Sequence, residues 1–191
     1  MDFEKINTTP LSVVGIIVGT LIPLMLAVTI FLDGEWQFNV DTLSNLGISK
    51  NELAAFLFNT ICMVGGVLSV VTGLGRIYVK GGEDVPSGVL LALAGIFLFL
   101  VGVFTKAPET RSIHIVVAGI FFALVWFAML ASMIADYHLK RRVSATITSI
   151  IFVVIVASMP GFTPGGVEVI SFIGMYVWLI VQGLSLAFSK Q

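Results

Sequence analysis

The stretch SIHIVVAGIFFALVWFAMLASMIA, residues 112–135, contains no Asp, Glu, Lys or Arg, and it decides the fold class. A helix needs about 20 apolar residues to cross the roughly 30 Å hydrocarbon core of a bilayer. Because hydrocarbon offers no hydrogen-bond partners, a crossing segment of this length must pair its own backbone groups as a helix. The whole sequence holds six uncharged stretches of similar length and therefore predicts six transmembrane helices, over residues 11–32, 53–75, 85–105, 112–135, 143–159 and 169–188.

The composition supports a membrane protein with one domain. The chain is 58% hydrophobic and only 11% charged, whereas soluble domains carry about 25% charged residues. The connections between the predicted spans are short, so we expect a single all-α bundle over residues 1–191. A net charge of −1 gives no indication of a nucleic-acid partner. The lone cysteine, Cys62, lies within the second span and excludes a disulfide framework; we expect a small buried side chain there.

The distribution of basic residues predicts the orientation. Cytoplasmic loops are enriched in Lys and Arg, and one side of the predicted topology holds seven of the ten basic residues together with both termini. We therefore expect both termini in the cytoplasm, with the protein in the cell membrane. The seven are Lys5, Arg76, Lys80, Lys140, Arg141, Arg142 and Lys190, and the outer side holds Lys50, Lys106 and Arg111. The Lys140–Arg142 cluster is interpreted as a topology determinant, or alternatively as a contact for anionic lipid headgroups.

Glycines predict close helix packing. Gly15 and Gly19 form a G-x-x-x-G pair, and Gly88, Gly95 and Gly102 repeat every seven residues. Small residues allow helix backbones to approach closely in a membrane. We expect these faces to pack inside the bundle, although such a stripe would also suit a homo-oligomer or a membrane-protein partner.

No predicted span has an ionisable residue in its interior, where such residues usually mark ion or proton pathways. A small-molecule transporter is therefore the third-ranked interpretation. The amides Asn59 and Gln182 lie within spans and need partners. Each is expected either to hydrogen-bond between helices or to line a cavity for a headgroup.

Residues that could catalyse a reaction or bind a ligand gather in the predicted outer loops. His114 opens the fourth span and offers an acid, base or ligand group, and Lys106 and Arg111 suit phosphate. Three acids on separate loops are candidates to orient His114 or bind a metal: Asp33, Asp41 and Glu109. No protease or hydrolase motif is present, so neither a metal nor another cofactor is predicted.

Several polar residues have a structural interpretation. Ser49 and Glu52 match a capping box that would open the second helix. Thr163 and Pro164 match the cap and first position of the sixth. Glu168 then lies near that helix start, where the dipole favours an acid.

Two groups of residues form a pattern that covers most of the chain. They are Leu43-Ser44-Asn45-Leu46-Gly47, Ala54–Asn59 and Gly65-Gly66, followed by Gly95, Gly102, His114, Gly119 and Phe121-Phe122. This pattern resembles a six-span prokaryotic membrane family, domain of unknown function 998, and more distantly the six-span Frag1/DRAM/Sfk1 proteins, which are associated with lipid handling. The resemblance implies a six-helix fold and marks Ser44, Gly47, Asn59 and His114 as characteristic positions. Asn45 stands where that family commonly has Asp.

The leading hypothesis is a non-enzymatic membrane protein that binds or organises lipid, or a membrane partner, at its outer-leaflet rim. Its candidate ligand residues are Ser44, Asn45, Asn59, Lys106, Arg111, His114 and Gln182. The alternative is an interfacial enzyme that acts on a lipid headgroup or isoprenoid phosphate, with His114 as acid or base. In either case we expect His114 to face the bundle and to hydrogen-bond Ser44, Asn45 or Asp41.

Overall fold

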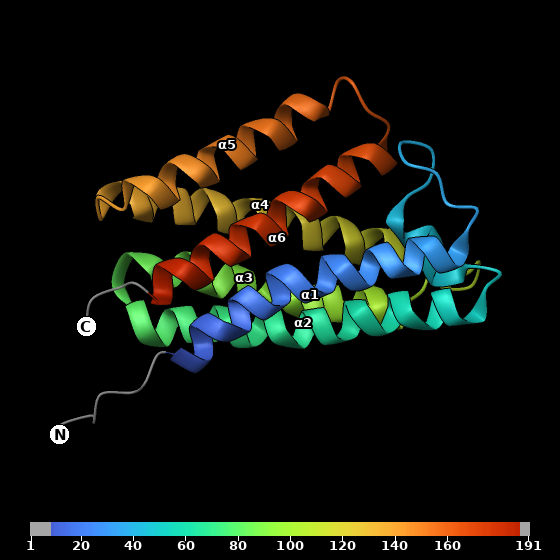
Figure 1. The fold of residues 1–191 in the computed structure, drawn as a ribbon, viewed down its shortest axis with the longest axis horizontal. Helices are drawn as coiled ribbons and strands as arrows, with labels where there is room; N and C mark the ends of the chain where they lie inside the picture. The colour runs from blue at the N-terminus through green and yellow to red at the C-terminus, as the bar shows by residue number, and fades with distance from the viewer. Residues whose placement is uncertain (1–8, 188–191) are drawn as a thin grey trace.

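The structure is a computed structural model that describes residues 9–187 (Figure 1). Lys5 and Lys190 therefore lie outside the described residues. The described part of the chain forms six α-helices and two short 3₁₀ helices, α1 (Thr9–Asp33), η1 (Leu43–Ile48), α2 (Glu52–Lys80), η2 (Gly82–Asp84), α3 (Val85–Val103), α4 (Arg111–His138), α5 (Arg142–Ser158) and α6 (Pro164–Ala187).

The helices run along one axis, and α1 begins at the same end of the bundle at which α6 finishes (Figure 1). We call the end that holds residues 34–51, 104–110 and 159–163 the loop end. The opposite end, which holds residues 81–84 and 139–141, is the basic end. At the basic end α5 lies near α4, and it diverges from α4 toward the loop end (Figure 1).

The predicted spans all coincide with helices, but their lengths differ. Within residues 9–187, five helices are long and apolar enough to cross a membrane, which identifies a membrane protein. The remaining helix, α5, has only 17 residues. At 1.5 Å per residue it measures about 26 Å, slightly less than the hydrocarbon core. Helices α2 and α4 each run several residues past the uncharged stretches, and α6 begins at Pro164, because a charged side chain ends such a stretch without ending a helix.

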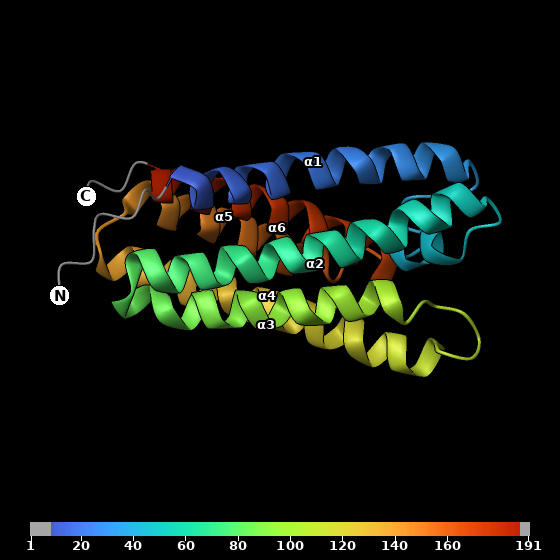
Figure 2. The ribbon, with the colours of Figure 1, turned by 90° about the horizontal axis from the view of Figure 1, so that it is seen from below.

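The glycine repeat of α3 packs against α2, which lies beside it (Figure 2). Gly88 and Gly95 face glycines of α2, and Gly102 faces the Asn59 backbone. A Cβ atom at Gly66 would lie 2.6 Å from the Gly95 carbonyl oxygen, and one at Gly73 would lie 2.5 Å from that of Gly88. The predicted tight packing of this helix is confirmed, and its partner is the helix that precedes it.

The G-x-x-x-G pair is also used within the chain. A Cβ atom at Gly15 would lie 3.3 Å from Gly183 Cα, and one at Gly19 would lie 2.8 Å from the Tyr176 carbonyl oxygen. Helix α1 therefore packs closely on α6. Cys62 is buried, as expected.

The start of α2 corrects one prediction. Asn51, not Ser49, caps this helix, since its Oδ1 accepts hydrogen bonds from the backbone N–H groups of Leu53 and Ala54 at 3.1 and 3.3 Å. Ser49 lies two residues too early and donates its hydroxyl to Asp33 at 2.5 Å. The capping box with Glu52 is therefore wrong.

The predicted start of α6 is confirmed. Pro164 is its first residue, and Thr163 Oγ1 accepts from the Gly166 N–H at 3.4 Å.

Candidate functional site

Glu168 fastens the first loop to the bundle at the loop end. Its carboxylate accepts hydrogen bonds from the Leu43 N–H at 3.1 Å and the Ser44 hydroxyl at 3.3 Å. These bonds join the start of η1 to the first turns of α6. The sequence predicts for Glu168 only a favourable interaction with the helix dipole, and these hydrogen bonds to the first loop were not predicted. The available signal was a single acid one turn inside an otherwise uncharged helix.

Lys106 joins the α3–α4 loop to the same place. Its ammonium group donates to Asn45 Oδ1 at 2.5 Å and to Thr42 Oγ1 at 2.8 Å. Burial lowers the pKa of Lys106, nearby Glu168 opposes this change, and Arg111 adds to it. Arg111 makes no hydrogen bond or ion pair with another described residue, so the two cations leave the site with positive charge available to a ligand.

His114 faces the bundle, as predicted, with only 3% of its surface exposed. Its predicted partner is wrong: Nδ1 bonds the Phe104 carbonyl oxygen at 2.6 Å rather than a residue of the first loop. The α3–α4 loop turns back on itself and brings this carbonyl to the start of α4. The expected partners bond elsewhere, since Asn45 accepts a hydrogen bond from Lys106 and Ser44 donates one to Glu168. Because a carbonyl only accepts, Nδ1 carries the proton, and Nε2 is an acceptor in the neutral ring. Nε2 has no partner among the described residues.

These side chains border a pocket of about 680 Å³ between the loop-end halves of α4 and α6, the start of η1 and the α5–α6 loop. We call it the loop-end pocket. Its polar residues are Thr42, Ser44, Lys106, Arg111, His114, Glu168 and Ser171, and its apolar residues include Ile115, Ala118, Gly119, Phe122, Trp126, Met159, Phe162 and Val167. The lining positions on α4 run from Arg111 to Trp126, about 22 Å along the helix axis. The pocket therefore has a cationic mouth and a long apolar wall.

Three other candidate residues, Asn59, Asp41 and Asp33, hold the first loop in place. Asn59 donates to the Gly47 carbonyl at 3.1 Å and holds η1 on α2, outside the pocket. Asp41 accepts from the Gln37 N–H and the Asn45 side chain, and Asp33 accepts from Ser49. These acids stabilise the first loop.

Glu109 is exposed. None of the three acids proposed to orient His114 forms a hydrogen bond or ion pair with it in the described chain. Within residues 9–187 no group of three His, Cys, Asp or Glu side chains is placed to hold a metal ion.

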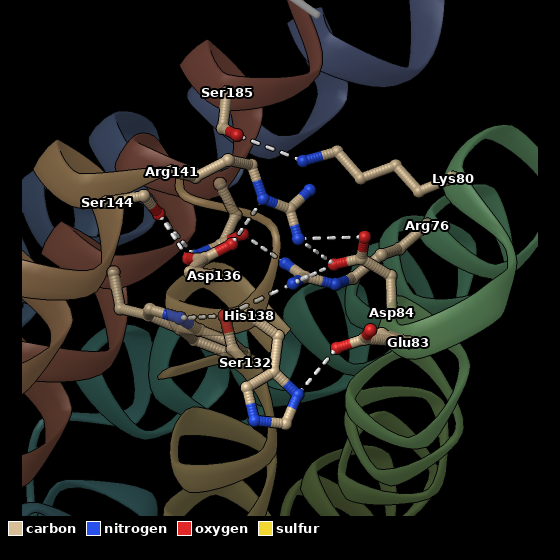
Figure 3. A network of polar contacts seen from close by, with 12 residues as sticks. Arg76, Lys80, Glu83, Asp84, Ser132, Asp136, His138, Arg141, Ser144 and Ser185 are labelled. Atoms are coloured by element: carbon tan, nitrogen blue, oxygen red, sulfur yellow. Dashed lines mark hydrogen bonds and ion pairs between the residues drawn. The ribbon is translucent and has the colours of Figure 1, made fainter. Parts of the chain in front are cut away.

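Gln182 is buried and belongs to a polar cluster at the basic end. Figure 3 shows the charged residues of this cluster. Its side chain accepts from Arg76, which is only 2% exposed, and donates to Ser144 at 3.3 Å. Arg76 also bonds Asp84 at 2.5 Å. We call this cluster the basic-end network; its members are Arg76, Asp84, Ser132, Asp136, Arg141, Ser144 and Gln182.

The basic-end network corrects two predictions. Gln182 is not a ligand residue of the outer rim, and Arg76 is a buried residue rather than a loop charge. Arg141 bonds Asp84 at 2.8 and 2.9 Å and pairs with Asp136 at 2.7 Å. Two arginines and two aspartates thus neutralise each other, which makes their burial tolerable. The network joins α2, η2, α4, α5 and α6.

The model of the family described as "Protein of unknown function (DUF998)" matches residues 16–185, so the chain belongs to that family. The resemblance seen in the sequence is therefore confirmed. No curated protein and no solved structure matches the chain. The more distant likeness to Frag1/DRAM/Sfk1 proteins stays a prediction.

Proposed function

We propose that this member of the DUF998 family binds a lipid in the loop-end pocket, with an anionic headgroup at the mouth and an acyl or isoprenoid chain along the apolar wall. The observation that carries the proposal is the union of both surfaces in one pocket of about 680 Å³. We further propose that all six helices cross the cell membrane and that both termini are cytoplasmic. The pocket then faces the outer leaflet.

The basic residues at the mouth of the pocket bind the anionic headgroup. The ammonium group of Lys106 uses two of its three N–H groups on Thr42 and Asn45, so one remains for a ligand oxygen. Arg111, on the first turn of α4, offers a planar guanidinium that suits a phosphate group. Both cations border the pocket.

The wall accommodates the chain. A Cβ atom at Gly119 would meet no atom within 4 Å, so space is open there. Surrounding lipid is as apolar as this wall, and burial of a lipid chain in it gains little. Selection of one lipid over another must therefore come mainly from the headgroup contacts.

Removal of the two cations tests this proposal. Native mass spectrometry of the detergent-purified protein should show a retained anionic lipid, and the Lys106→Gln/Arg111→Gln variant should lose most of it. Lys50→Gln is the matched control, because Lys50 lies at the same end but pairs with Glu35 on the surface at 2.9 Å. Equal lipid retention in the double variant and the wild type would contradict the proposal.

A second candidate function is supported by His114. Its Nε2 atom lacks a partner, and the ring lines the pocket beside Lys106 and Arg111. We propose as the alternative that Nε2 acts as general base in hydrolysis of a bound headgroup phosphate or isoprenoid phosphate. Nε2 takes a proton from a water molecule that attacks the phosphorus, the P–O bond to the lipid alcohol breaks, and the departing alcohol oxygen takes up a proton as inorganic phosphate is released. Phosphate release from such a lipid should then disappear in His114→Asn, whose amide nitrogen can still donate to Phe104, while lipid retention persists. Equal release by this variant would exclude the role.

A further inference from the structure

A second hollow, of about 630 Å³, lies at the basic end between α5 and α6. Its mouth is formed by Lys140, Arg141 and Arg142, and its wall includes Ile147, Val181 and Leu184. We call it the basic-end groove. We propose that it binds an anionic phospholipid, with the phosphate at the three basic residues and an acyl chain on the apolar wall. This site is separate from the loop-end pocket and does not depend on its function.

The charge of the groove specifies an anionic occupant. No acid lines it. The two nearest acids, Asp84 and Asp136, are fully buried and engaged by the arginines of the basic-end network. Lys140 and Arg142 are exposed and form no ion pair within the described residues. A basic pocket beside apolar helix surface at a membrane boundary is suited to an anionic headgroup.

One of the three basic residues at the mouth, Arg141, is held in position before any ligand binds. Arg141 is restrained by Asp84 and Asp136 and remains 22% exposed (Figure 3). Ser144, in the first turn of α5, donates to Asp136 at 2.5 Å and fixes the start of that helix. A fixed cationic site binds with a smaller entropy cost than a mobile one.

The backbone at Lys140 gives an independent indication. Its φ of 57° lies in the left-handed region. The Arg141 N–H donates to the Asp136 carbonyl and the Lys140 N–H to that of Tyr137. This is the Schellman pattern, in which glycine usually occupies the position of Lys140. A lysine is strained there, and its charge borders the groove.

The experiment uses the purified full chain in mixed micelles with phosphatidylglycerol or phosphatidylcholine. The wild-type melting temperature should rise with phosphatidylglycerol only. Lys140→Gly should melt no lower than the wild type without lipid, because glycine relieves the backbone strain, yet it should gain less from phosphatidylglycerol. Lys140→Gly/Arg142→Gln should bind phosphatidylglycerol about tenfold more weakly or worse. Equal stabilisation of the double variant and the wild type would overturn the proposal.

Three controls separate the groove from simpler explanations. Lys50→Gln removes a basic residue at the other end and should respond like the wild type. Leu184→Trp keeps every charge but fills the groove, and it should lose as much of the stabilisation as the double variant does. If Leu184→Trp kept the full stabilisation, the lipid would bind by surface charge alone and the groove would be refuted. Glycerol 3-phosphate should not reproduce the stabilisation, and if it did, the occupant would be a soluble phosphate instead of a lipid.

Discussion

At the scale of single residues, His114 has one ring nitrogen committed to the fold and the other available. The 2.6 Å bond from Nδ1 to the Phe104 carbonyl holds the end of α3 beside the start of α4. The same bond fixes the neutral ring so that Nε2 carries a lone pair. One residue thus both stabilises the loop end and shapes the pocket.

Replacement of His114 separates these two roles. His114→Ala leaves the buried Phe104 carbonyl without its donor, and we expect the free energy of unfolding to fall by about 1–3 kcal/mol. His114→Asn places an amide nitrogen near the Nδ1 position and should restore much of that loss. Chemical unfolding in detergent micelles measures both. If both variants were as stable as the wild type, the hydrogen bond to Phe104 would not contribute to the free energy of unfolding.

The burial of His114 could be predicted from sequence, because an imidazole in lipid lacks partners. Its partner could not, since the choice of Phe104 depends on the path of the α3–α4 loop. The same holds for Glu168, whose tie to Leu43 and Ser44 spans about 125 residues of chain. Asn and Ser are both common N-cap residues, so residue type alone does not tell whether Asn51 or Ser49 caps α2. The position at which α2 begins determines that Asn51 is the cap.

At the scale of helices, close packing of α2 on α3 depends on facing glycines. A methyl group at Gly95 would come within 2.6 Å of the Gly66 carbonyl oxygen and 2.7 Å of the Val70 nitrogen. Both are backbone atoms, which cannot rotate away. The helices would have to separate to admit any side chain.

Alanine substitutions test this packing directly. Gly95→Ala should lower the free energy of unfolding by about 1–3 kcal/mol through overpacking. Gly119→Ala is the matched control, because its Cβ atom would meet nothing within 4 Å and alanine favours the helix. Thermal melts in the same detergent should therefore rank Gly95→Ala below the wild type and Gly119→Ala at or above it. The opposite order would show that the two helices are not closely packed.

The number of helices and the glycine spacing follow from sequence because both are local patterns. The lengths of α2 and α4 do not, since Arg76 and Asp136 end the uncharged stretches. These charges become tolerable inside the bundle only through partners, and the pairing of Arg76 with Asp84 and Gln182 requires the assembled fold.

At the scale of the whole molecule, the two ends of the bundle differ in character. The loop end has a cationic pocket with an apolar wall, and the basic end has a neutralised network beside a basic groove. Arg76 is buried, so it no longer counts among the loop charges that orient the chain. Lys140 and Arg142 remain exposed at that end.

Cysteine labelling tests the orientation that follows. We expect the basic end in the cytoplasm, because exposed basic residues collect there. In intact cells an impermeant thiol reagent should label Gln37→Cys and not Lys140→Cys, and permeabilised cells should label both. Native Cys62 is buried and adds no background. Labelling of position 140 alone in intact cells would reverse the topology.

The central claim is that the loop-end pocket holds a lipid, and blocking the pocket without altering any charge tests it most directly. Gly119→Phe should fill the open space, while Val116→Phe adds the same ring one turn earlier on a position that is 60% exposed and outside the pocket. The measurement is lipid occupancy by native mass spectrometry. We predict that the wild type and Val116→Phe retain the lipid and that Gly119→Phe loses it, whereas undiminished occupancy in Gly119→Phe would contradict the claim.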